Sequence, residues 1–549
     1  AKRGLLVVGG GSSAADSIAA ASIAKTLGWA VAADATSGMR VGASPRDDVR
    51  LVSMIDYVLV EPKAHDALRP DVVLQVGSRL TSKRLCQFLE ASAIDHGAEW
   101  IVVEPTPNRL DAAHCVGVRV ESSIGHAAKI LEDALTRESG YDSSESKAAC
   151  VAFAERAVAV GAAVTREAAV ALNDITANEG LSEMGVAVAV SEGLPDSMGL
   201  FLGNSMPIRD VDAFAGIARL AGSDRRDVLV ASIGAPVTAN RGASGIDGVI
   251  SSAAGYAAGL GHPVTLIIGD VSFQHDSNGL LFLRERPGQP PVTVVVVNNG
   301  GGGIFNFLPV ASQIDDESFN RLFATPPDVS RRGLCEAHRV AYGHPTSPEE
   351  LDDALREAWN EGRHNVIEVT TSRARNLIQH KTVQRRCARA ARRALELSET
   401  STSRTIAKVE TATFSLPLRR STTTSDGASS STRDGWLLRV TLDDGSVGLG
   451  ECSPLPGLHR ETLAESGAQL AVIASLLERV DVSTNVALLN GAFTSWIEDV
   501  VGVRSSGELF PSVRFAVESA VAVAVAASAG KTLSRVMTGD DTRANVDDV

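Results

Sequence analysis

Two apolar runs stand out in the middle of the chain. Val264–Ile268 is followed by Gly269 and Asp270, and Val292–Val297 is followed by two asparagines, Asn298 and Asn299, and four glycines. Runs of this kind predict strands buried on both faces of a parallel sheet. Because ligands in such sheets bind at the carboxyl ends of the strands, we expect Asp270 and Asn299 to converge on one site.

The same alternation of short apolar runs with helical segments continues from residue 1 to residue 372 and predicts two doubly wound α/β domains. A polar, alanine-rich stretch, residues 136–185, predicts helices between them. The strands expected in the first domain are Leu5–Val8, Ala30–Ala33, Tyr57–Val60, Val72–Val76, Trp100–Val103 and Gly117–Val120. Those expected in the second are Leu200–Leu202, Val228–Ala231, Thr265–Ile268, Thr293–Val297 and Val366–Thr370.

After a helical segment at residues 376–397 the pattern changes to that of strands. Thr411–Leu418, Trp436–Leu442 and Val447–Glu451 predict an antiparallel meander with a turn at Asp443-Asp444-Gly445. Ser421–Arg433 consists almost wholly of small polar residues, so we expect it to remain disordered.

Composition narrows the class of protein. The chain has 549 residues, 52 basic and 66 acidic, and this acidic balance argues against a general nucleic-acid binder. Six scattered cysteines without a C-x-x-C pair suggest neither a zinc site nor a disulfide framework. No apolar run approaches the roughly 20 residues that cross a bilayer, so we expect no membrane span. One basic cluster is expected to form the solvated face of a helix: Lys381, Arg385, Arg386, Arg389, Arg392 and Arg393.

The strand ends carry oxygen ligands for a hard cation. Asp270 offers a carboxylate, Asn299 offers an amide oxygen, and the glycines let a main-chain carbonyl, that of Gly301, approach as a third ligand. About half of an octahedral Mg²⁺ shell then stays open for phosphate and water. The alternative is a pair of ordinary turns, which explains each half of the pattern but not both together.

A second phosphate site is conceivable near the N-terminus. Gly9-Gly10-Gly11 follows the first strand, and Asp34 lies where a ribose-binding acid could stand. The match to a dinucleotide-binding fingerprint is incomplete, and a Rossmann-like domain with an empty crevice is the preferred interpretation.

These motifs carry a family resemblance. The segment from Gly269-Asp270 to Asn298-Asn299 resembles the thiamine diphosphate motif of the decarboxylase and carboligase superfamily. Three further segments look like 2-succinyl-5-enolpyruvyl-6-hydroxy-3-cyclohexene-1-carboxylate (SEPHCHC) synthase of menaquinone and phylloquinone synthesis: residues 203–209 (GNSMPIR), 240–248 (NRGASGIDG) and 303–305 (GIF).

The resemblance implies a thiamine diphosphate and Mg²⁺ cofactor pair. Asp270, Asn299 and Gly301 match the metal-binding positions. The matching cofactor-binding positions are Ser205, Ile246, Asp270, Val271, Ser272, Asn299 and Gly301. Ile246 matches the apolar wedge that bends the cofactor, although its residue type alone indicates a core position. Ser272 can donate to a phosphate oxygen, or simply cap a helix.

The implied reaction decarboxylates 2-oxoglutarate and adds the resulting succinyl semialdehyde anion equivalent to isochorismate. Both substrates are carboxylates, which cationic side chains bind well. Lys83, Arg84, Arg209 and Arg241 match the substrate-binding positions of the family. An apolar wall is expected from Ile304, Phe305 and Leu308, for which a core position is a nearly equal alternative.

The C-terminal part resembles a different family. Residues 448–457 (GLGECSPLPG) and 511–520 look like the capping domain of o-succinylbenzoate synthase, of the enolase superfamily, and the start of its barrel. One chain with both parts resembles the PHYLLO-type fused enzymes of plants and algae, which implies a chloroplast location. The resemblance to the thiamine diphosphate superfamily implies a homo-oligomer, dimer or tetramer, with its site between subunits.

The expected organisation is therefore two Rossmann-like domains of the thiamine diphosphate enzyme fold followed by an α+β enolase-type capping domain. Its segments are a central Rossmann-like domain at 1–135, a helical bridge at 136–185, a thiamine diphosphate-binding domain at 186–375, a helix and linker at 376–405, and the capping domain at 406–549.

Two parts of the family pattern are not matched. The pyrimidine-binding domain with its activating glutamate would precede Leu5, and the enolase-type barrel needs about 250 residues. We therefore expect the chain as given to be inactive alone as a carboligase and to lack o-succinylbenzoate synthase activity. Alternatives are another thiamine diphosphate carboligase, similar to acetolactate synthase, and a non-catalytic scaffold for pathway enzymes.

Overall fold

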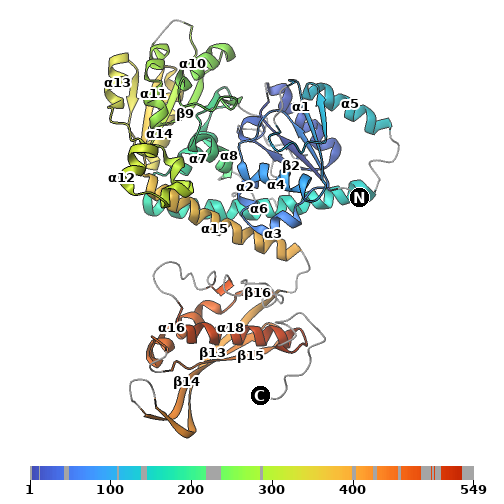
Figure 1. Cartoon of the computed structure of the whole chain (residues 1–549), viewed down its shortest axis with the longest axis vertical. Helices are drawn as coiled ribbons and strands as arrows, with labels where there is room; N and C mark the ends of the chain where they lie inside the picture. The colour runs from blue at the N-terminus through green and yellow to red at the C-terminus, as the bar shows by residue number, and fades with distance from the viewer. Residues whose placement is uncertain are drawn as a thin grey trace. The chain divides into compact units, whose positions relative to one another are not determined.

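The computed structural model divides the chain into two compact units, residues 1–395 and 396–549. It describes residues 3–11, 13–41, 49–107, 111–137, 145–217, 236–284, 288–398, 403–423, 429–455, 459–483, 496–497, 500 and 509–533. The first unit holds two parallel sheets with helices on both faces, and the second holds an antiparallel sheet with helices (Figure 1).

The first sheet is parallel throughout, in the order β3-β2-β1-β4-β5-β6. Its strands are β1 (Gly4–Val8), β2 (Ala30–Ala33), β3 (Arg50–Leu51), β4 (Val72–Val76), β5 (Glu99–Glu104) and β6 (Val118–Glu121). The helices are α1 (Ala14–Leu27), η1 (Ala35–Ser37), α2 (Ile55–Val58), α3 (Pro62–Ala67), α4 (Lys83–Ile94), α5 (Ile124–Arg137) and α6 (Glu145–Glu179).

Alternate residues of β1 enter different cores. Leu6 and Val8 pack with α1 and α5, whereas Leu5 and Val7 face a core that includes α2, α4 and α6. Because both faces are covered, each strand position is apolar, which explains the continuous runs in the sequence. The expected strand Tyr57–Val60 is wrong: Tyr57 lies in α2, whose Ile55, Tyr57 and Val58 are buried against the sheet.

The second sheet is also parallel, in the order β11-β12-β10-β9-β7-β8. Its strands are β7 (Gly199–Leu202), β8 (Val237–Ala239), β9 (Val264–Gly269), β10 (Val292–Asn298), β11 (Ala341–Gly343) and β12 (Asn365–Thr370). The expected strand Val228–Ala231 lies outside the described residues. The helices and helical turns are α7 (Glu183–Gly193), α8 (Met206–Phe214), α10 (Val249–Leu260), α11 (Asp270–His275), η2 (Ser277–Leu283), η3 (Gly303–Phe307), η4 (Pro309–Ser312), α12 (Asp316–Phe319), η5 (Asn320–Ala324), α13 (Arg331–His338) and α14 (Pro348–Glu361).

Two long helices cover the first unit from one side, α6 and α15 (Arg373–Ser398), and they lie side by side (Figure 1). Arg386 on α15 reaches Glu167 and Asp174 on α6, and Arg392 pairs with the buried Glu61. The sequence predicted a solvated face for this basic cluster. The prediction is wrong for two of its arginines, Arg386 and Arg392, because they make ion pairs within the unit.

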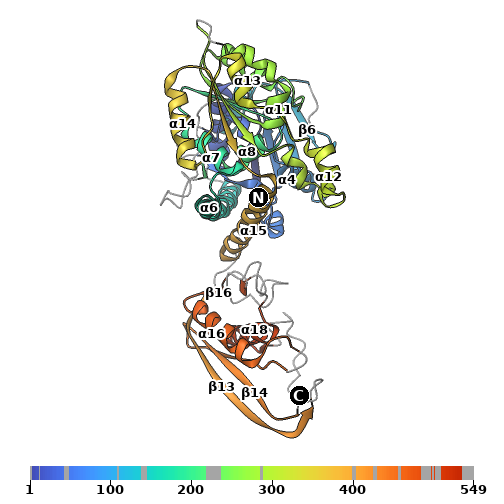
Figure 2. The same cartoon turned by 90° about the vertical axis from the view of Figure 1, so that its left-hand side faces the viewer.

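The second unit is a four-stranded antiparallel sheet in the order β15-β14-β13-β16. Its strands are β13 (Ser403–Thr423), β14 (Ser429–Leu442), β15 (Val447–Cys452) and β16 (Asp481–Ser483), and its helices are α16 (Leu463–Leu477) and α18 (Pro511–Ser528). β13 and β14 form a long curved ribbon (Figure 2). Within Ser421–Arg433, the residues described belong to this ribbon, with Thr422 opposite Ser430, so the expectation of disorder is wrong there.

Glycines of β15 bring α18 against the sheet. A Cβ atom at Gly448 would lie 1.8 Å from the carbonyl oxygen of Ala520, and one at Gly450 would lie 1.8 Å from that of Ala516. Both distances are far below van der Waals contact, so only glycine permits this packing. The core beneath α18 includes Leu438, Val440 and the small residues of the helix.

Two of the described helices are long and apolar enough to span a membrane by length and composition, at Lys147–Glu179 in α6 and Pro511–Ser528 in α18. The expectation of no membrane span therefore stays a prediction. In each, half or more of the apolar window is buried inside the protein, 50% and 56%, as in core helices.

Candidate functional site

The carboxyl ends of β7, β8, β9 and β10 meet at one edge of the second sheet. The chain runs from β7 outward to β8 and then to β9 on the other side of β7, so the strand order reverses there, the usual ligand position in such sheets. Side chains join the loops: Asn204 donates to the Gly245 carbonyl at 2.9 Å, and Ser272 donates to the Ile246 carbonyl at 2.7 Å. The loops of β7, β8 and β9 therefore form one connected surface.

Asp270 lies directly after β9 and is buried, with 1% of its surface exposed. Its two carboxylate oxygens accept backbone N–H groups, Oδ1 from Val271 at 2.9 Å and Oδ2 from Gly301 at 2.8 Å. Arg331 approaches Oδ2 at 3.8 Å and also pairs with Glu368 at 3.2 Å. Burial raises the pKa of Asp270, while these N–H groups and Arg331 oppose the rise.

Asn299 lies directly after β10. Its Nδ2 donates to Oε1 of Glu183 at 2.9 Å, and its Oδ1 is buried without a hydrogen-bond partner among the described residues. Burying an amide oxygen without a hydrogen-bond partner costs free energy unless a ligand binds to that oxygen.

The sequence analysis missed Glu183. It is buried at the start of α7, and its pKa is raised to about 8 by burial and by the charges of Asp210 and Asp270, against the opposing hydrogen bond from Asn299. No local pattern around Glu183 points to the site, because its position depends on how α7 packs. Arg331, on α13, was missed for the same reason.

Gly301 has a backbone conformation that requires glycine. Its φ is 130°, and a Cβ atom there would lie 2.3 Å from the carbonyl oxygen of Ala324. Its own carbonyl accepts the N–H of Gly303 at 2.9 Å. A carbonyl oxygen has two lone pairs, so one remains for the proposed third metal contact.

These groups fit a magnesium ion. The carboxylate of Asp270 and the unpartnered amide oxygen of Asn299 lie at the ends of the adjacent strands β9 and β10. Mg²⁺ sites in proteins usually consist of one or two carboxylates together with phosphate and water. Among the residues that the structure describes, no group of three or more His, Cys, Asp or Glu side chains could hold a metal, so a site rich in nitrogen or sulfur ligands is not indicated there.

Two further positions lie on the same surface. Ser205, at the start of α8, has φ 72° and ψ −129°, a conformation that costs a non-glycine residue about 1–3 kcal/mol. Ile246 is 38% exposed, which excludes the core position that its residue type indicated. Ser272 does not cap α11, and its single hydroxyl proton is engaged with Ile246, so donation to a phosphate would require that hydroxyl to turn.

The four expected substrate-binding residues belong to both domains of the first unit: Arg209 and Arg241 to that of the second sheet, Lys83 and Arg84 to that of the first. Arg209 on α8 donates to the Ser205 carbonyl, and burial and the nearby charge of Arg241 lower its pKa. Nε of Arg241 is buried without a partner among the described residues, and Arg241 lines a cavity of about 590 Å³ together with Arg79 and Arg119. Lys83 and Arg84 begin α4 instead, where Lys83 is exposed and Arg84 pairs with Asp56.

The expected apolar wall lies in and just after η3. Ile304 and Phe305 are partly exposed, and Leu308 is 47% exposed, so none of the three is a core residue. Phe305 packs edge-on against Phe323, with ring centroids 5.6 Å apart. These side chains therefore remain accessible beside the glycine run.

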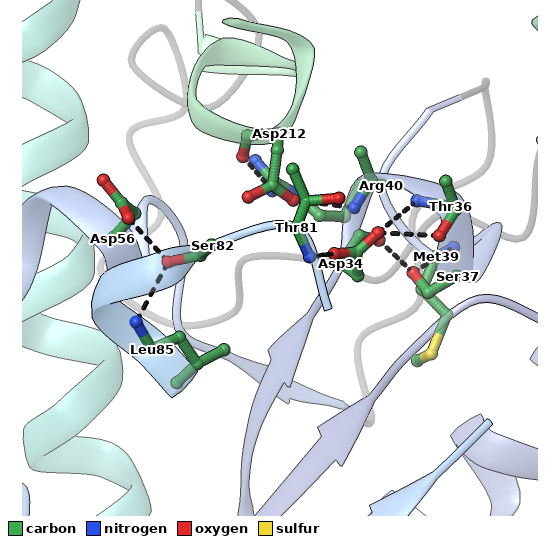
Figure 3. Close-up of polar contacts among 11 residues, drawn as sticks. Asp34, Thr36, Ser37, Met39, Arg40, Asp56, Thr81, Ser82, Leu85 and Asp212 are labelled. Atoms are coloured by element: carbon green, nitrogen blue, oxygen red, sulfur yellow. Dashed lines mark hydrogen bonds and ion pairs between the residues drawn. The ribbon is translucent and has the colours of Figure 1, made fainter. Parts of the chain in front are cut away.

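Asp34 is not free to bind a ribose. Its Oδ1 accepts the N–H of Thr36 at 2.9 Å and the Thr36 hydroxyl at 2.7 Å, and its Oδ2 accepts the N–H of Thr81 (Figure 3). A Cβ atom at Gly9 would lie 2.0 Å from the carbonyl oxygen of Ser78, so this glycine serves a close contact within the protein. Both observations favour the Rossmann-like domain without a nucleotide.

The neighbouring Asp212 should make stability depend on pH (Figure 3). Burial and the charge of Asp34 raise the pKa of Asp212 from 3.8 to about 8. Above about pH 4 the unfolded chain releases this proton while the folded chain keeps it, so the free energy of unfolding falls as the pH rises toward 8. Asp212→Asn, which keeps an acceptor for the Ala35 N–H, should flatten this dependence in urea denaturation between pH 5 and 8.

The exposed Asp352→Asn, on α14, is the control and should leave the slope as in the original protein. An unchanged slope for Asp212→Asn would contradict the assignment of the proton to Asp212.

Comparison with known protein families agrees with this geometry. Residues 1–202 match the middle domain of thiamine pyrophosphate enzymes, residues 237–369 their C-terminal TPP-binding domain, and residues 407–493 the MenC N-terminal domain. Asp270 and Asn299 both fall inside the match to the TPP-binding domain.

One relative matches almost the whole chain, and others match about 70% of it. Protein PHYLLO, chloroplastic, from Arabidopsis thaliana is 35% identical over 96% of this chain, which covers 31% of that protein. The SEPHCHC synthases of Salinibacter ruber and Rubrobacter xylanophilus are each 36% identical over 69% and 70% of this chain, which covers 58% and 60% of their lengths. The chain thus spans about three fifths of the bacterial synthases it matches and about a third of PHYLLO.

The matched domains, the two parallel sheets and the separate antiparallel sheet lead to one conclusion: this chain joins the middle and C-terminal domains of the thiamine diphosphate enzymes to a MenC-type N-terminal domain.

Proposed function

We propose that residues 1–395 form the magnesium- and diphosphate-binding part of a SEPHCHC synthase, a transferase of menaquinone and phylloquinone synthesis. The observation that carries the proposal is the buried, unpartnered Oδ1 of Asn299 beside Asp270 at the ends of adjacent strands. A buried amide oxygen without a hydrogen-bond partner costs free energy, and a bound cation would remove that cost.

In this proposal Asp270, Asn299 and the Gly301 carbonyl hold Mg²⁺, which holds the diphosphate. Thiamine diphosphate, when bound, supplies a stabilised carbanion, and the protein must bind it, orient it and exclude water. Ile246, whose side chain is exposed and whose carbonyl accepts the Ser272 hydroxyl, would contact the cofactor as an apolar wedge. Ser205, just before α8, and Val271, in α11, would contribute backbone groups to the cofactor site.

The substrates we propose are 2-oxoglutarate and isochorismate. The nearby charge of Arg241 contributes, after burial, to lowering the pKa of Arg209, and such a proximity of like charges costs free energy unless an anion binds beside them. Lys83 and Arg84 would contribute further positive charge from α4, and Ile304, Phe305 and Leu308 the apolar wall. An acetolactate synthase-like enzyme, acting on small 2-oxo acids, would not need this concentration of positive charge.

Arg241→Gln should weaken binding of 2-oxoglutarate by about tenfold or more, because a hydrogen bond to a charged group contributes about 1.5–3 kcal/mol. Ligand-observed NMR on the chain saturated with Mg²⁺ and thiamine diphosphate measures it. Arg356→Gln, an exposed change on α14, is the control. If pyruvate bound as well as 2-oxoglutarate, and both were insensitive to Arg241→Gln, the acetolactate synthase-like alternative would be favoured.

Location and assembly follow from the relatives and are also proposals. The chloroplast is indicated by the name of the Arabidopsis relative, and a homo-oligomer is expected from the resemblance. Light scattering of the purified chain would test the second point.

A further inference from the structure

Glu183 occupies an unusual position for a carboxylate. It is the first residue of α7, where Ser182 caps the helix by accepting the N–H of Gly185 at 3.0 Å, and only 3% of its surface is exposed. Buried carboxylates are costly and persist where they are hydrogen-bonded or paired. Its hydrogen bond with Asn299 joins two segments that are 116 residues apart in the chain.

This hydrogen bond fixes which way the Asn299 amide points. In the structure the amide nitrogen donates to Oε1 of Glu183 at 2.9 Å, a bond that this oxygen can accept whether or not the carboxyl group is protonated, and the amide oxygen faces away from Glu183. Glycine at position 303 leaves room for this nitrogen, because a Cβ atom there would lie 2.6 Å from it. The opposite end of the amide is the buried Oδ1 that has no partner among the described residues.

We propose that Glu183 is a positioning residue for the metal: it orients Asn299 so that Oδ1, and not the NH₂ group, faces a divalent cation bound by Asp270. This inference rests on the proposed function and adds a residue from outside the strand-end loops. If the amide were free to turn, its NH₂ group would face the cation in part of the molecules. Residues that orient metal ligands typically affect metal affinity by 10–100-fold.

Two variants of Glu183 separate the hydrogen bond from the charge. Glu183→Ala and Glu183→Gln both remove the titratable carboxyl group at the start of α7, but only glutamine keeps an oxygen that accepts from Asn299. The probe is Mn²⁺ with thiamine diphosphate, and electron paramagnetic resonance reports the free Mn²⁺. We expect Glu183→Ala to weaken Mn²⁺ binding about 10–100-fold, and Glu183→Gln to retain most of the affinity.

A second pair of variants reverses the polarity of the contact. Asn299→Asp places a second carboxyl group against Glu183, where the pair must either hold a proton between them or move apart, so Mn²⁺ binding should weaken although the new ligand is anionic. Adding Glu183→Gln to Asn299→Asp should restore binding, because the glutamine amide can donate to the aspartate. A role for Glu183 in helix stability alone would give no such rescue.

The outcomes are distinguishable. If the original chain does not bind Mn²⁺ and thiamine diphosphate together, both the proposed function and this inference fail. If it binds them and Glu183→Ala binds equally well, the proposed function stands and the inference is overturned. If Glu183→Ala does not fold, as judged by circular dichroism, the rescue of Asn299→Asp decides: rescue supports the inference and its absence overturns it.

Discussion

Asp270→Ala should abolish magnesium-dependent binding of thiamine diphosphate, with a loss in affinity of more than about 100-fold. Asp270 is the carboxylate at the end of β9 in the proposed metal site, and removing it leaves Mg²⁺ with neutral ligands from the protein. Isothermal titration calorimetry of thiamine diphosphate into the chain, with and without Mg²⁺, measures this directly. The original chain should show heat of binding only when Mg²⁺ is present.

The control for Asp270→Ala is Asp352→Ala, an exposed position on α14 that should bind like the original chain. Because Asp270 also accepts two backbone N–H groups, the thermal midpoint of each variant should be measured to confirm folding. Binding in Asp270→Ala as tight as in the original chain would refute the metal site. No binding by the original chain would favour the scaffold alternative.

Gly450→Ala should destabilise the second unit by about 3 kcal/mol or more. The added Cβ atom would lie 1.8 Å from the carbonyl oxygen of Ala516, and neither backbone can move without separating α18 from β15. Overpacking a core usually costs about 1–3 kcal/mol, and a contact with backbone is at the upper end because no side chain can turn away. Hydrogen exchange followed by mass spectrometry on the full chain should show faster exchange across α18 and β15.

The neighbouring Leu449→Ala provides a matched control, because Leu449 lies on the other face of β15 and is 54% exposed. Its effect should stay within about 0.5 kcal/mol, as for most surface substitutions. Exchange in the first unit should be unchanged in both variants. Equal protection of α18 in Gly450→Ala and the original chain would show that the close packing of helix and strand is wrong.

The buried strands could be predicted from the sequence because parallel strands covered on both faces leave a continuous apolar run. Val264–Gly269 and Val292–Asn298 were located to within a residue or two for this reason. The predicted strand at Tyr57–Val60 was wrong because a short buried helix also produces a short apolar run, and the length of the run cannot distinguish a strand from a helix. Short strands with little apolar sequence, such as β3 and β11, gave no signal.

The error at Ser421–Arg433 has a different cause. Low hydrophobicity excludes a buried core, but a two-stranded ribbon pairs its backbone groups without one. Threonine is β-branched and favours strands, so Thr422 and Thr423 can extend a ribbon whose core lies further along it. Low hydrophobicity therefore argues against a buried core in this segment, but it does not argue against paired strands.

The strand-end residues of the candidate site could be predicted because sheet topology brings strand ends together whatever the packing of helices. Asp270 and Asn299 needed only the assignment of two strands. Glu183 and Arg331 needed the positions of α7 and α13 against the sheet, which depend on tertiary contacts that no short segment encodes. The roles of Lys83, Arg84, Arg209 and Arg241 remain predictions.

The contact between β15 and α18 also limits where residues can be inserted into this unit. Gly448 meets Ala520 and Gly450 meets Ala516, so two strand residues match four helix residues running in the opposite direction. Two strand residues span about 6.6 Å, and four helix residues rise about 6 Å. The spacing of the two glycines along β15 therefore matches the spacing of the two alanines along α18. One residue inserted into either segment between these contacts would place a side chain against a backbone carbonyl. Insertions should therefore be tolerated in the turns of this unit but not within this matched pair.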